Sequence, residues 1–84
     1  MATQLEHTDT FGGEANYCWV KRAFTERDMT PRQEIRFAKA WAGLTGIRCR
    51  VENYGDMTAI YPRGICQVVF IDFIESEYAR GERL

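Results

Sequence analysis

The longest run of apolar positions in the chain lies at residues 65–74. The run is rich in β-branched and aromatic side chains and is bounded by turn-forming residues at 62–64 and polar residues at 75–77, so it predicts a β-strand. Both faces of this strand are apolar, with Gln67 as the polar exception on one face and Asp72 on the other. Such strands usually lie in a sheet that is covered on both sides, so we expect this one at the centre of a sheet.

A second pattern predicts an amphipathic helix from Pro31 to about Leu44. Thr30 and Gln33 have the spacing of a capping box, and proline is favoured in the first turn of a helix. The residues Thr45-Gly46 provide the expected stop. The apolar stripe at helical spacing comprises Phe37, Ala38, Trp41 and Leu44.

Three further segments have the alternation of strands. Residues 15–25 have mixed polarity on both faces, and we expect Cys18, Val20 and Phe24 to point inward. Residues 47–54 alternate apolar and charged positions, which predicts a strand with one solvated face. A turn at 53–56 leads to a strand at 57–61, so this pair and the apolar run should form an antiparallel meander.

The order strand, helix, strand, strand, strand predicts an α+β fold in which one helix packs on a four-stranded, mostly antiparallel sheet. We expect one domain over residues 1–84. Within it, the polar segment 1–10 should be a flexible arm, residues 11–74 the core, and the charged residues 75–84 a tail that forms a short helix or frays.

One helix can cover only one face of this sheet. The apolar run is therefore expected to leave apolar side chains exposed on the other face, and a large exposed apolar surface normally marks an interaction site. We expect it to be covered either by a protein partner or by a second copy in a homodimer that joins the two sheets face to face.

Composition limits the classes of function. The chain has 11 basic and 12 acidic residues and a formal charge of −1, so it lacks the overall positive charge of a nucleic-acid-binding domain. Its longest apolar run is too short to span a membrane. The cysteines Cys18, Cys49 and Cys66 lack paired spacing, which favours small buried thiols in a reducing cytoplasm.

No residue pattern indicates catalysis or metal binding. The only histidine, His7, lies in the polar N-terminal segment, so neither a nucleophile–histidine pair nor a zinc site is predicted. Asp72 would have acid–base potential if it were buried, but pairing with an arginine or a solvent-facing position is the favoured interpretation. We therefore expect no enzyme activity, no cofactor and no metal.

Basic residues gather at one place in the predicted sheet. Arg48 and Arg50 share the solvated face of one strand, Arg63 lies in a nearby turn, and Tyr54 and Tyr61 are expected close by. Basic side chains beside aromatic ones are typical of surfaces that bind single-stranded nucleic acid. A protein interface and an ordinary solvated sheet face would show the same pattern, so all three interpretations stay open at this point.

Residues 9–22, with the sequence DTFGGEANYCWVKR, resemble a motif found in small proteins of bacterial phages, prophages and other mobile elements. The stretches 43–50 (GLTGIRCR) and 55–62 (GDMTAIYP) are similar to the same family. The resemblance implies a phage accessory role in the cytoplasm of a bacterial host, and it carries over no catalytic residues.

One familiar class of small phage accessory proteins inhibits host defence and includes the anti-CRISPR proteins. By analogy with that class, we expect a non-enzymatic protein that binds and inhibits a host defence complex. Aromatic and arginine side chains dominate the energetics of interfaces. The contact candidates are Tyr17, Trp19, Arg48, Arg50, Tyr54 and Arg63. The alternative is a nucleic-acid-binding accessory or regulatory protein, although the neutral charge and the lack of a helix-turn-helix pair disfavour it.

Overall fold

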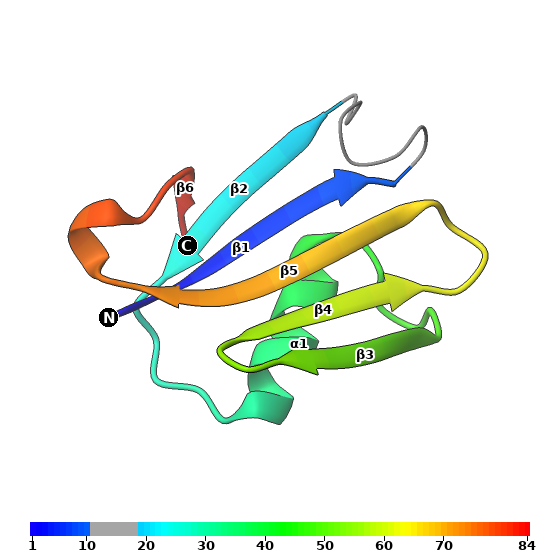
Figure 1. The fold of residues 1–84 in the computed structure, drawn as a ribbon, viewed down its shortest axis with the longest axis horizontal. Helices are drawn as coiled ribbons and strands as arrows, with labels where there is room; N and C mark the ends of the chain where they lie inside the picture. Colours follow the sequence, from blue (N-terminus) through cyan, green and yellow to red (C-terminus); the bar gives the residue numbers. More distant parts are fainter. Residues whose placement is uncertain (11–18) are drawn as a thin grey trace.

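The computed structural model describes residues 1–10 and 19–84. These residues form one α-helix on a six-stranded sheet with the strand order β3-β4-β5-β1-β2-β6 (Figure 1). The elements are β1 (Ala2–Asp9), β2 (Val20–Thr25), α1 (Pro31–Trp41), β3 (Cys49–Tyr54), β4 (Met57–Pro62), β5 (Gln67–Ile74), a 3₁₀ turn (Ser76–Tyr78) and β6 (Glu82–Arg83). Neighbouring strands are antiparallel, except that β6 runs parallel to β2. The α+β class is confirmed, whereas the predicted number of strands is wrong because β1 and β6 were not expected.

The segment that we expected to be a flexible arm forms β1, an interior strand between β5 and β2. Leu5 is fully buried and lies opposite Ile71 of β5. The polar side chains around it have partners: the Thr8 hydroxyl donates to the Trp19 carbonyl over 2.6 Å, and Glu6 pairs with Arg22 over 3.2 Å. Because these polar groups are satisfied, a mostly polar sequence can occupy the middle of the sheet.

The apolar run forms β5, which lies between β4 and β1 as an interior strand. Val69 and Ile71 point to the face covered by α1 and join Leu5 and Ile60 in the buried core. The predicted antiparallel meander of β3, β4 and β5 is confirmed by the strand pairing. The long strand β5 therefore connects the two halves of the sheet.

The helix begins as predicted. The Gln33 backbone N–H donates to the Thr30 hydroxyl over 3.2 Å, and the Thr30 N–H donates to the Gln33 side chain over 2.9 Å, which completes the capping box. The helix ends at Trp41, earlier than predicted, because Gly43 adopts a left-handed conformation with φ 74°. Leu44 is nevertheless buried, so the predicted apolar stripe still reaches the core.

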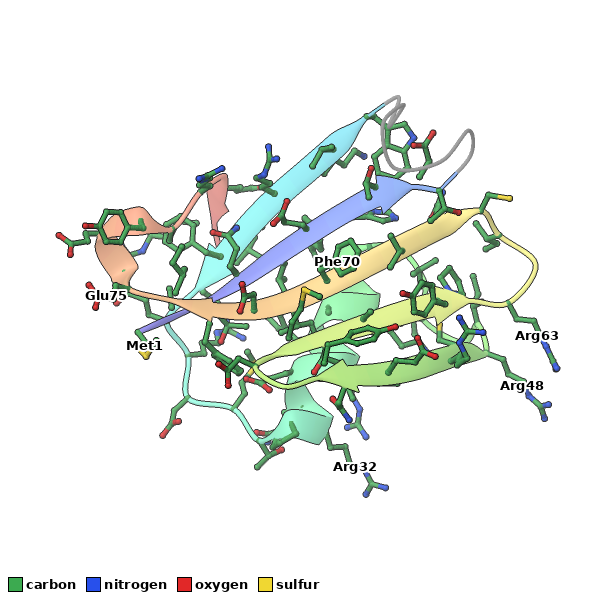
Figure 2. All side chains as sticks on the ribbon, in the orientation of Figure 1. Met1, Arg32, Arg48, Arg63, Phe70 and Glu75 are labelled. Atoms are coloured by element: carbon green, nitrogen blue, oxygen red, sulfur yellow. The ribbon has the colours of Figure 1, made fainter. Side chains whose placement is uncertain are left out.

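Figure 1 views the sheet from the face that α1 does not cover. On this face Val68 is buried and Phe70, in the middle of the sheet in Figure 2, is half-buried. Asp72 is exposed, and its carboxylate accepts a hydrogen bond from the Phe73 N–H over 2.8 Å, which agrees with the expected solvent-facing position. Phe73 is 45% exposed, but alternation places it on the same face as Val69 and Ile71, so this exposed residue of the run does not lie on the face that α1 leaves uncovered.

Two expectations about inward-facing residues are wrong. In β2, Ala23 and Thr25 are buried while Val20 is 38% exposed, because the register with β1 turns the small residues toward the helix. Cys66 is exposed rather than buried, since it precedes β5 in the turn. Cys18 lies outside the described residues.

The charged tail does not fray and forms a short 3₁₀ helix at Ser76–Tyr78, close to the predicted position. After the 3₁₀ turn it returns to the sheet, where β6 pairs with β2 and the Leu84 N–H donates to the Phe24 carbonyl over 2.8 Å. The Gln4 side chain also holds the backbone of Arg80. The tail therefore closes the edge of the sheet beside β2.

Candidate functional site

Strand pairing brings the three predicted arginines together at one corner of the sheet. Arg50 lies opposite Tyr61, and the Arg63 N–H donates to the Arg48 carbonyl over 2.8 Å where β3 begins and β4 has ended. Figure 2 shows Arg48 and Arg63 projecting from this same corner. We call these three arginines, with Tyr54 and Tyr61, the arginine corner.

The three arginines and Tyr61 line an open hollow of about 490 Å³. Cys49 and Pro62 complete its wall. Pro62 is buried, so it provides a fixed apolar base for the hollow, while the arginines at its rim are exposed. The hollow therefore combines an apolar wall with several cationic donors.

Arg50 is the arginine whose charge is partly balanced. Its guanidinium carbon lies 4.6 Å from the centre of the Tyr61 ring, and its Nε atom lies 3.5 Å from a carboxylate oxygen of Glu52. The side chain is still 68% exposed, and exposed pairs of this kind contribute little to stability. Within residues 1–10 and 19–84, neither Arg48 nor Arg63 has an ion-pair partner for its guanidinium group. Two positive charges at the corner are therefore available to a ligand.

Tyr54 links the acidic and aromatic residues of the corner. Its hydroxyl donates a hydrogen bond to Glu52 and lies 3.4 Å from the hydroxyl of Tyr61. The hydrogen bond to Glu52, followed by the one to Tyr61, raises the pKa of Tyr54 above its usual value. The Tyr54 hydroxyl therefore keeps its proton to a more alkaline pH than an ordinary tyrosine does.

The structure separates Trp19 from the arginine corner. Trp19 packs edge-on against His7, with 4.7 Å between the ring centres, and the Nζ atom of Lys21 lies 5.9 Å from the Trp19 ring. His7 belongs to β1, and β5 lies between that strand and β4. Tyr17 lies outside the described residues. Of the six predicted contact residues, Arg48, Arg50 and Arg63 therefore line the hollow together, and Tyr54 is linked to it through its contact with Tyr61.

His7 has a structural role that the sequence did not indicate. Its ring is buried between Trp19 and Trp41, with 6.0 Å between its centre and that of Trp41, and its Nε2 atom lies 2.9 Å from the Gln67 side-chain oxygen. The alternation that places His7 on the same face as Leu5 could have revealed it, but the polar neighbours obscured that pattern.

A second hollow, of about 560 Å³, lies along the helix and is lined in part by Arg27, Arg36 and Phe37. The Arg27 guanidinium lies 5.5 Å from the Phe37 ring. This surface also presents arginine beside an aromatic ring, but Asp28 lines the same hollow and lowers its positive charge. The arginine corner is therefore the stronger candidate for binding an anionic surface.

The chemistry of the corner is that of recognition. Guanidinium groups donate paired hydrogen bonds to carboxylates and phosphates, and their planes stack on aromatic rings. Among the residues that the structure describes, no group of three or more His, Cys, Asp or Glu side chains is placed to hold a metal ion. Within residues 1–10 and 19–84, no helix is long and apolar enough to cross a membrane.

No protein-family model, no curated protein and no solved structure matches this chain.

Proposed function

We propose that this protein is a non-enzymatic inhibitor that binds a bacterial host defence complex through the arginine corner. The observation that supports this proposal is the pair of exposed guanidinium groups, Arg48 and Arg63, which have no ion-pair partner in the described chain and lie beside the stacked Arg50 and Tyr61. The host and the inhibitory role rest on the resemblance to phage accessory proteins.

The corner suits an acidic protein surface. Its arginines are held near one another by the paired backbones of β3 and β4, so binding would order the side chains but leave the strands unchanged. Arginine and tyrosine are also the residues that most often dominate interface energetics, especially where they lie close together. An acidic patch on the target would form paired hydrogen bonds with Arg48 and Arg63.

Affinity capture from lysates of a bacterial host, treated with nuclease, tests the proposal. The unmodified chain is compared with a double variant, Arg48→Glu and Arg63→Glu. A matched control carries Arg32→Glu and Arg36→Glu, which make the same charge change on the helix; Figure 2 shows Arg32 away from the corner. We expect the unmodified chain and the control to retain the same host protein. The corner variant should bind it at least about tenfold more weakly, because two interface arginines are reversed.

Two results would contradict the proposal: capture of no host protein, or equal capture by the corner variant. If the corner-dependent capture is observed, the purified chain should be added to the purified target complex to test whether it inhibits the activity of that complex. Binding without any loss of that activity would retain the interaction but exclude the inhibitory role.

Single-stranded nucleic acid is the alternative ligand, because Tyr54 and Tyr61 lie beside the arginines as in surfaces that stack bases. A gel shift over a range of salt concentrations distinguishes the two. Affinity that falls steeply with salt would favour nucleic acid, whereas no binding at low salt would exclude it.

A further inference from the structure

Strand β3 ends the sheet on one side, and no described strand lies beyond it (Figure 1). The N–H and C=O groups on the outer side of such a strand have no ladder partner, so they form a template for another strand. The opposite side of the sheet ends in β6, which has two residues. The six residues of β3 therefore form the longer open edge.

The strand pairing shows which residues of β3 face outward. The Arg48 carbonyl accepts from the Arg63 N–H, so the backbone polar groups of Arg48 point toward β4. Because this direction alternates along a strand, Arg50 and Glu52 also point toward β4, whereas Cys49, Val51 and Asn53 point away from it. Pro62 lies opposite Cys49, at a position where no N–H is needed, which agrees with this assignment.

We propose that a second copy of this chain pairs with β3 in the antiparallel direction, with Val51 opposite Val51 of the second copy. The two sheets would then form one continuous sheet with a twofold axis at Val51. Both helices would lie on the same face, because Val51 lies opposite Ile60, which belongs to the core beneath α1. This dimer joins edges, and so it differs from the face-to-face dimer expected from the sequence.

Charge complementarity selects this partner and this register. With Val51 at the centre, Arg50 lies opposite Glu52 of the second copy, and Glu52 lies opposite Arg50 of the second copy. These are the pairs without backbone hydrogen bonds, in which opposing side chains come closest. Each Arg50 already lies 3.5 Å from its own Glu52, so the four charges would alternate around the axis.

Neighbouring registers are less complementary. Pairing centred on Arg50 would also keep the outward groups together and would place Arg48 opposite Glu52, but it would bring the two copies of Arg50 together at the axis. Pairing centred on Glu52 would likewise bring the two copies of Glu52 together. Like charges at directly opposed positions destabilise a strand pair. Among the symmetric registers near the middle of β3, the one centred on Val51 pairs opposite charges without opposing any like charges. It also brings together two copies of Val51, a side chain that is 38% exposed in the single chain.

Sedimentation equilibrium over a wide range of protein concentration tests the proposal with a charge-reversal set. The set contains the unmodified chain, Arg50→Glu, Glu52→Arg and the double variant with both changes. Each single change places like charges opposite each other at two symmetric positions. We therefore expect the unmodified chain to dimerise and each single variant to associate at least about tenfold more weakly. The double variant restores opposite charges and should dimerise like the unmodified chain.

Arg50 and Glu52 also pair within one chain, so the double variant restores that internal pair as well. Circular dichroism of all four chains therefore has to show that the single variants are folded. A monomeric unmodified chain at the highest accessible concentration would overturn the proposal. So would single variants that associate normally, or a double variant that does not recover.

Hydrogen exchange separates the edge-to-edge dimer from a face-to-face one. The Val51 and Asn53 N–H groups should exchange more slowly as the concentration rises, while Glu52, which already faces β4, should change little. A dimer in which Val51 and Asn53 exchange as fast as in the monomer would contradict edge pairing. Both measurements use the chain alone, so their outcome is independent of any host target.

Discussion

The Gln4 side chain binds both backbone polar groups of Arg80, which lies 76 residues further along the chain. The amide nitrogen donates to the Arg80 carbonyl over 2.9 Å, and the Arg80 N–H donates to the amide oxygen over 2.7 Å. The same nitrogen donates to the Ala23 carbonyl over 3.0 Å. One side chain of the interior strand β1 thus holds the C-terminal segment against the sheet.

Replacing Gln4→Ala should release that segment. The change removes four hydrogen bonds, these three and one of 3.4 Å to the Leu5 carbonyl, and it leaves the backbone groups of Arg80 and Ala23 without the Gln4 partner. We therefore expect the free energy of unfolding to fall by about 1–3 kcal/mol. Chemical denaturation measures this change, and the Arg80 N–H should exchange faster. Gln67→Ala is a matched control, because it removes a hydrogen bond to His7 without touching the tail. Unchanged exchange at Arg80 in the Gln4 variant would contradict this role.

Gly81→Ala should detach β6. Gly81 has a φ of 89°, and a Cβ atom there would overlap the backbone carbonyl of Arg22. The new methyl group cannot be accommodated by rotating a side chain, so we expect a loss of about 2–3 kcal/mol and rapid exchange of the Leu84 N–H. Gly64→Ala provides the comparison, since Gly64 has a φ of 76° but open space around it. The Gly64 change should cost only about 1 kcal/mol, the strain of a left-handed backbone. Equal losses for the two variants would show that the contact with Arg22 is unimportant.

The arginine corner predicts an alkaline titration of Tyr54. Because the hydrogen bonds to Glu52 and Tyr61 raise its pKa in the folded state, the folded chain holds this proton more strongly than the unfolded chain does. The resulting stabilisation is fully present below the unfolded pKa of about 10 and is lost as the pH rises through the higher folded value.

Glu52→Ala should lower the pKa of Tyr54 toward the usual value, since it removes the hydrogen bond to Glu52, which is the largest cause of the raised pKa. The measurement is an NMR titration of the Tyr54 ring, at a protein concentration low enough to keep the chain monomeric. The titration of Tyr54 in the unmodified chain is the reference. A Tyr54 titration that is the same in the variant and in the unmodified chain would contradict the role of Glu52.

The elements predicted best are those whose stabilising interactions are local. The capping box of Thr30 and Gln33 joins residues three apart, and the β3–β4 hairpin closes through the short turn at Gly55. The same hairpin register places Arg50 opposite Tyr61, so most of the arginine corner followed from nearby residues. Trp19, another predicted contact residue, lies away from that corner because its position depends on the pairing of β1 with β2.

By itself, the sequence determined the capped helix, the apolar strand β5 and the hairpin that gathers Arg48, Arg50 and Arg63, because each depends on residues close together in the chain. The tertiary structure alone decided that the polar segment Ala2–Asp9 becomes an interior strand. Its stability comes from partners far away in the sequence: Ile71 opposite Leu5, Gln67 beside His7, and Arg80 held by Gln4. An alternation of polar and apolar residues predicts a strand when one face of the strand meets solvent and the other meets the core. The prediction fails for β1, because groups far away in the sequence form hydrogen bonds with its buried polar side chains.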